Sequence, residues 1–188
     1  MTEPFRRRLT LRGTDDAVDA DLEDHIHHVA VHVEHDAAHV TAIEGQGLRL
    51  PWSTCPDALA LLDELIGAPV GTLPRVHDAR AHCTHLLDVA RMAIGFAGSG
   101  RRERTIDVTV HDWDTPRPRA EIVGHDGSAV AALFLKRALW MAPARGVDLD
   151  ALHTINQSGI GVGVCHTTQP ERYTIARRNR GSSLKELT

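Results

Sequence analysis

The sequence contains few aromatic residues and few cysteines. Among its 188 residues, 4% are aromatic, while 42% are hydrophobic, so a core formed by this chain must be mainly aliphatic. Its three cysteines are odd in number, widely spaced and without a Cys-x-x-Cys pair: Cys55, Cys83 and Cys165. This usage is typical of reduced thiols rather than of a disulfide framework, and it predicts a cytoplasmic protein.

Several other signals are also missing. The net charge of −4 argues against a nucleic-acid-binding protein, which usually carries an excess of basic residues. No apolar run reaches the roughly 18 residues that a membrane-spanning helix needs. The glycine-rich segment Ile160–Val164 lacks the spacing of a dinucleotide-binding loop, and no NAD, FAD or ATP motif is present. We therefore expect the protein to bind a small molecule and to bind neither nucleic acid nor a membrane. These patterns do not distinguish a monomer from a homodimer.

Histidine, by contrast, is abundant. The chain has 13 histidines, and the segment 25–36 reads HIHHVAVHVEHD. Its alternation predicts a strand whose valines face the core, so His27 lies on the buried face and His28 and His32 on a solvated face. An imidazole in line with three valines is either a hydrogen-bonded core residue or part of a site.

The segment Ala81–Gly98 is predicted to form the central helix, because its apolar residues recur at helical spacing and glycine follows. Cys83 lies at the helix entry, where the dipole can lower the pKa of a thiol, although it also lines up with the apolar stripe. His82, His85 and Asp88 are three residues apart, so we expect them to share one helix face.

The remaining patterns predict an α+β fold in one domain over residues 1–188. An antiparallel sheet should pack against the central helix and a shorter helix, Asp57–Ile66. The first half, 1–100, carries the central helix, and the second half, 101–188, is expected to be β-rich. Strands are predicted at residues 5–11, 25–36, 40–43, 105–110, 120–123 and 128–133, the last two joined by a turn at 124–127. Residues 13–24 are predicted as an acidic turn, and residues 134–142 favour a helix.

Several short stretches together resemble a bacterial domain family of unknown function, DUF2889. The clearest is CTHL at Cys83–Leu86; the others are His27 before its strand, Cys55-Pro56 before a short helix, and Cys165. The segments 135–152 and 165–183 resemble the closing segments of actinobacterial members. The family brings no established activity or cofactor, but the resemblance places all three cysteines, His27 and His85 on motif positions and so implies a common site.

These residues support two kinds of enzyme site. In an acid–base or thiolate site, His85 moves protons and Cys83 acts as a nucleophile. Either His27 or Asp88 orients the imidazole. Substrate-binding residues are then expected at Cys165, His166, Asp88 and His82. In a metal site, zinc or another transition metal is held by ligands from Cys83, His85, His27, Cys165 and His166.

The functional prediction is therefore a small cytoplasmic enzyme that acts on a small organic molecule by acid–base or metal-assisted chemistry. A lyase, isomerase or hydrolase is favoured, because no nicotinamide or flavin motif appears. The alternative is a non-catalytic binding or accessory domain in which the cysteines and His27 are core residues. Conservative changes at Cys83 and His85 would be tolerated by such a domain and not by an enzyme.

Overall fold

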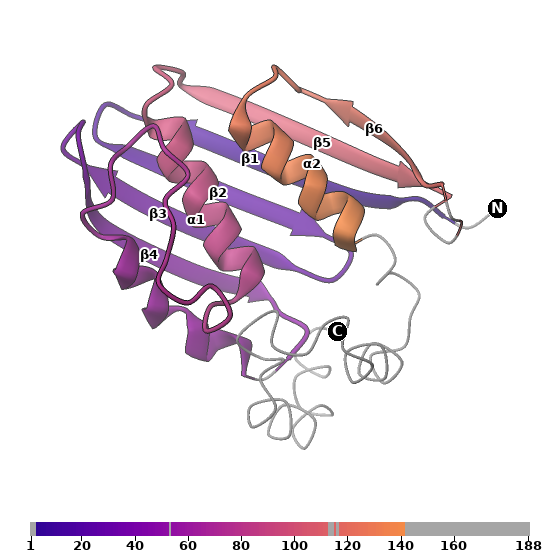
Figure 1. Cartoon of the computed structure of the whole chain (residues 1–188), viewed down its shortest axis with the longest axis horizontal. Coiled ribbons are helices and arrows are strands. Elements are labelled where there is room, and N and C mark those ends of the chain that lie inside the picture. The colour runs from indigo at the N-terminus through magenta and orange to yellow at the C-terminus, as the bar shows by residue number, and fades with distance from the viewer. Residues whose placement is uncertain (1–2, 53, 113–114, 116, 142–188) are drawn as a thin grey trace.

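The computed structural model describes residues 3–52, 54–112, 115 and 117–141. In this part of the chain six strands form one antiparallel sheet, which confirms the predicted α+β class (Figure 1). The strand order across the sheet is β4-β3-β2-β1-β5-β6. The strands are β1 (Phe5–Gly13), β2 (Ala17–Asp24), β3 (His28–His35), β4 (Val40–Arg49), β5 (Glu103–His111) and β6 (Arg119–Val123).

The prediction of a turn over residues 13–24 was wrong, because most of this segment is strand β2. Its alternate residues Val18, Ala20 and Leu22 are buried, while the acidic residues between them point to the other face. The clustered carboxylates had suggested a solvated turn. They lie instead beside basic residues of β1, where cross-strand pairing stabilises opposite charges.

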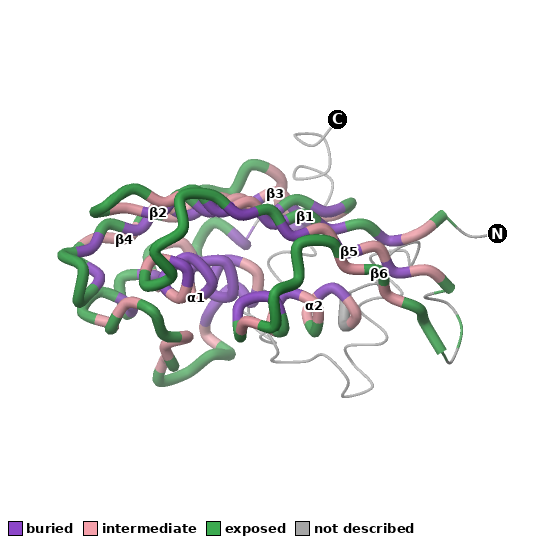
Figure 2. Tube along the Cα trace, turned by 90° about the horizontal axis from the view of Figure 1, so that it is seen from above, coloured by how far each residue is buried: buried purple, intermediate pink, exposed green. Residues whose placement is uncertain are grey.

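Both α-helices cover the same face of the sheet (Figure 2). Helix α1 (Thr84–Ala97) packs on β2 and β3, and its bounds agree with the predicted central helix except at the entry. The shorter helix predicted at Asp57–Ile66 is replaced by two 3₁₀ helices, η1 (Cys55–Ala58) and η2 (Ala60–Leu65). The buried residues Leu62 and Leu65 are three apart, which suits the three-residue turn of a 3₁₀ helix.

The strand predicted at 128–133 was also wrong. The turn before it is present, with Gly124 at φ +84°, but helix α2 (Ala129–Met141) follows. The Ser128 hydroxyl accepts a hydrogen bond from the backbone N–H of Ala131 at 3.2 Å, which is the bond of a helix cap. The helix then buries Phe134 at helical spacing from neighbouring alanines. None of the helices in the described residues is long and apolar enough to cross a membrane.

Replacing Phe134 tests the packing of α2 on the sheet. Phe134→Ala removes a fully buried ring, so it should lower the free energy of unfolding by about 3–5 kcal/mol. Lys136→Ala, at an exposed position of the same helix, should change it little. Urea denaturation of both variants measures the difference, and equal stabilities would show that α2 does not contribute to the core.

Candidate functional site

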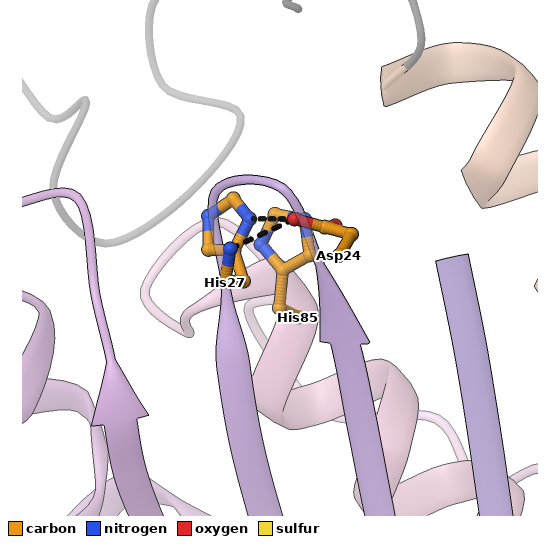
Figure 3. Close-up of side chains that lie close together, drawn as sticks. All are labelled: Asp24, His27 and His85. Atoms are coloured by element: carbon orange, nitrogen blue, oxygen red, sulfur yellow. Dashed lines mark hydrogen bonds and ion pairs between the residues drawn. The ribbon is translucent and has the colours of Figure 1, made fainter. Parts of the chain in front are cut away.

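The turn between β2 and β3 meets the first turn of α1, and this brings His27 and His85 together (Figure 3). Their rings stack with centroids 3.7 Å apart and planes 23° from parallel. His27 is buried, as its pattern predicted, although it precedes the strand instead of lying within it. Two histidines that are 58 positions apart in the sequence thus form one contact.

Asp24, the last residue of β2, completes the cluster. One donor atom from each of Asp24, His27 and His85 lies within 4.8 Å of the others. The Asp24 Oδ1 atom accepts hydrogen bonds from the backbone N–H groups of Ile26 and His27, each at 2.7 Å, and lies 3.4 Å from the Nδ1 atom of His27. This Asx turn fixes the backbone on which the His27 ring is mounted.

The Arg7 guanidinium neutralises Asp24 inside the protein. Its Nε atom donates to the Oδ2 atom of Asp24 at 2.9 Å, and its Nη2 atom makes a second, ionic bond to the same oxygen. Both side chains are almost inaccessible to water, at 1% and 0% exposure. Because a buried charge without a partner is strongly destabilising, each of these residues requires the other.

Arg49, the last residue of β4, contacts the backbone of the same turn. Its Nη2 atom donates to the backbone carbonyl of Asp24 and lies 3.4 Å from that of His27. It also donates to the Glu23 carboxylate at 3.2 Å. The turn that carries His27 is therefore held by two groups: the Asp24 carboxylate, which binds its backbone N–H groups, and the Arg49 guanidinium, which binds its backbone carbonyl.

The electrostatics of the site favour one carboxylate and two neutral imidazoles. Burial alone would raise the pKa of Asp24, but the hydrogen bond to His27 and the charge of Arg7 hold it well below the usual range. Burial lowers the pKa of His27, against the opposing effect of Asp24. Burial, with His27 and Arg7 as further causes, lowers the pKa of His85 still more. Near neutral pH both rings are uncharged.

His85 has unused hydrogen-bonding capacity. Its Nε2 atom is buried and has no hydrogen-bond partner among the described residues. Leaving a buried polar atom unpaired costs about 1–3 kcal/mol, so such an atom requires an explanation. A ligand that completes the site would provide one.

The other predicted site residues at the helix entry lie elsewhere. The expectation that His82 shares a helix face with His85 and Asp88 was wrong, because α1 begins at Thr84 after an extended residue, Cys83. The Nε2 atom of His82 is 2.9 Å from the carboxylate of Glu64 on η2. Cys83 is buried within the main hydrophobic core, as the apolar stripe had suggested.

Asp88 lies one turn beyond His85 and is buried against α2. Its carboxylate forms ion pairs with Arg137 and, at 3.7 Å, with Arg91. Burial raises the pKa of Asp88, and the two arginines oppose that rise. The predicted site residues Cys165 and His166 lie outside the described residues, so their expected place beside His27 stays a prediction.

Sequence reasoning missed Asp24 and Arg7. The available signal was strand alternation, because Arg7 stands between Phe5 and Leu9 at inward positions of β1. Asp24 likewise continues the inward series of β2. A charged residue of each sign on the inward face of two adjacent strands indicates a buried ion pair.

Comparison with known proteins finds one family to which the segment carrying this site is similar. Residues 9–96 match the model of a family described as a protein of unknown function, DUF2889. The matched segment covers less than half of the chain; it includes Asp24, His27 and His85, while the closing segments likened to actinobacterial members lie outside it. No curated protein and no solved structure matches the chain.

Substituting Asp24 tests the buried ion pair. Asp24→Asn leaves Arg7 buried without a counter-charge and should destabilise the fold by about 3–5 kcal/mol. Since the folded-state pKa of Asp24 is depressed, its contribution is complete above about pH 4, its unfolded range, and is lost as the pH falls below that. Denaturation at pH 7 and pH 3 should thus show a smaller pH effect in the variant. Asp15→Asn, in an exposed pair, is the control; an equal loss in both variants would contradict the assignment.

The state of His85 can be read by NMR of its ring nitrogens. Because the folded-state pKa of His85 is lowered, the unfolded state binds more protons below about pH 6.5, and stability is lost as the pH falls through that range. We expect the His85 ring to be neutral at pH 6, with the signal assigned by its disappearance in His85→Gln. A protonated ring at pH 6.5 would show that the site is not desolvated.

Proposed function

We propose that this protein is a small cytoplasmic enzyme that uses His85 as a general base on a small organic molecule. The observation that carries the proposal is a stacked imidazole pair set against a buried carboxylate, with the Nε2 atom of His85 left without a partner among the described residues. A neutral imidazole has a lone pair that can accept a proton, and the lowered pKa keeps His85 in that form at neutral pH.

His27 and Asp24 would then act as positioning residues. The His27 ring lies flat against His85 and limits its rotation. The Asp24 carboxylate stays ionised, so its negative charge stabilises the imidazolium that forms when His85 accepts a proton. Lyase, isomerase and hydrolase reactions each contain such a proton-transfer step, and all three remain within the proposal.

The geometry favours an imidazole over a thiol for this role. Cys83 is a core residue at the helix N-cap, which weakens its case as a nucleophile. His82 and Asp88, expected to bind substrate, are engaged with Glu64 and Arg137. Roles in substrate binding for Cys165 and His166 stay part of the proposal.

A metal-assisted reaction is the second candidate. Two imidazoles and a carboxylate within 4.8 Å are a ligand set that zinc or another transition metal accepts. However, the Asp24 oxygens already accept bonds from two backbone N–H groups and from Arg7. Nearly parallel rings also point their in-plane lone pairs side by side instead of toward one ion. The observed arrangement therefore supports proton transfer better.

Proton exchange into solvent tests the general base. We would incubate small carbonyl and carboxylic compounds with untagged protein in D₂O and follow loss of acidic C–H signals by ¹H NMR. Because the base supplies the proton acceptor, His85→Gln should slow exchange by about 100-fold or more. His28→Gln, on the opposite sheet face, and Cys83→Ser should retain it. Equal rates in wild type and His85→Gln would reject the proposed base.

Elemental analysis of the same preparation separates the two candidates. One equivalent of a transition metal, lost in both His27→Ala and His85→Ala, would favour the metal-assisted reaction. A chelator should then also lower the melting temperature. A conservative change at His85 that leaves both exchange and metal content unaltered would favour the binding or accessory domain instead.

A further inference from the structure

A cavity of about 680 Å³ opens at the end of the sheet where β1, β2 and β5 meet. Its lining includes Arg6, Arg8, Glu23, His25, Arg49 and Asp107. Arg6, Arg8 and Glu23 occupy the exposed positions of their strands, which alternate with the buried positions that face the helices. The volume falls within the range of small-molecule sites.

This cavity adjoins the cluster at Asp24 but is not lined by its two histidines. Asp24 and Arg7 are among its lining residues, but their side chains are almost fully covered and are paired with each other. The stacked rings of His27 and His85 do not line it. A molecule in the cavity would therefore not touch the proposed base.

The charges around the cavity do not cancel. Arg8 forms a two-pronged ion pair with Asp107, with bonds of 2.7 and 2.9 Å. Arg49 is paired with Glu23. For the side chain of Arg6 no hydrogen bond or ion pair is found among the described residues, so its positive charge stands uncompensated in the lining.

Arg49 provides a second, independent sign of a missing partner. Its Nε atom is buried and has no hydrogen-bond partner in the part of the chain that the structure describes. Two guanidinium groups with unused donors, in one cavity, are the arrangement that recognises carboxylate or phosphate oxygens. The other two arginines of the lining are occupied, Arg8 by Asp107 and Arg7 by Asp24.

We propose that this cavity is a binding site for a small oxyanion, the phosphate or carboxylate group of a small molecule, held by the guanidinium groups of Arg6 and Arg49. Arg49 also donates a hydrogen bond to the backbone carbonyl of Asp24. An anion bound to Arg49 would therefore contact a residue that itself contacts the turn that positions His27. The site does not depend on the proposed catalytic role of His85.

Thermal denaturation with sodium phosphate and with sodium acetate tests this site, with sodium chloride at equal ionic strength as the reference. Either anion should raise the melting temperature in a saturable way, because binding to the folded state alone stabilises it. Arg6→Gln, which loses no side-chain hydrogen bond or ion pair within the described residues, should fold normally and weaken the apparent affinity about tenfold. Arg12→Gln, at an exposed position farther along β1, is the matched control.

Saturation by phosphate alone or by acetate alone would support the site and name the anion. The proposal is overturned if neither anion exceeds chloride, or if Arg6→Gln and Arg12→Gln respond alike. His85→Gln should bind both anions as wild type does, so a failure of the proposed base leaves this result unaffected.

Discussion

The buried ion pair between Arg7 and Asp24 is the constraint on which the rest of the site depends. It joins two adjacent strands on the face that α1 covers, where neither charge can reach water. Such a pair contributes little net stability, but breaking it is costly, so it specifies a geometry more than it strengthens the fold. The geometry that it specifies is the turn from Asp24 to His27.

From that turn the arrangement follows step by step. Backbone N–H groups orient the Asp24 carboxylate, the carboxylate sets the position of His27, and His27 stacks on His85 at the start of α1. Asp24 and His27 are buried and His85 is partly buried, and this burial lowers the pKa of both imidazoles beside the charged carboxylate. The proposed proton transfer uses that contrast between a fixed negative charge and two rings that resist protonation.

The sequence allowed the fold class, the central helix and the burial of His27 to be predicted, because each depends on local periodicity. It did not reveal that Asp24 and Arg7 meet, since strand pairing between residues 17 positions apart is a tertiary event. The acidic residues of β2 resembled a turn for the same reason: their partners lie on another strand. Helix α2 was predicted in part as a strand because Ser128, its cap, also suits a hairpin.

The strand order places the N-terminal strand in the interior of the sheet, between β2 and β5. The backbone hydrogen bonds along one edge of β1 can therefore form only after β5 has been synthesised, almost one hundred residues later. In that pairing Leu9 lies opposite Ile106. The segment that matches the family model, residues 9–96, ends before that strand. If expressed alone, it would present an unpaired interior edge, which is a template for association with other chains. The boundary of a family match is therefore not the boundary of a folding unit in this protein.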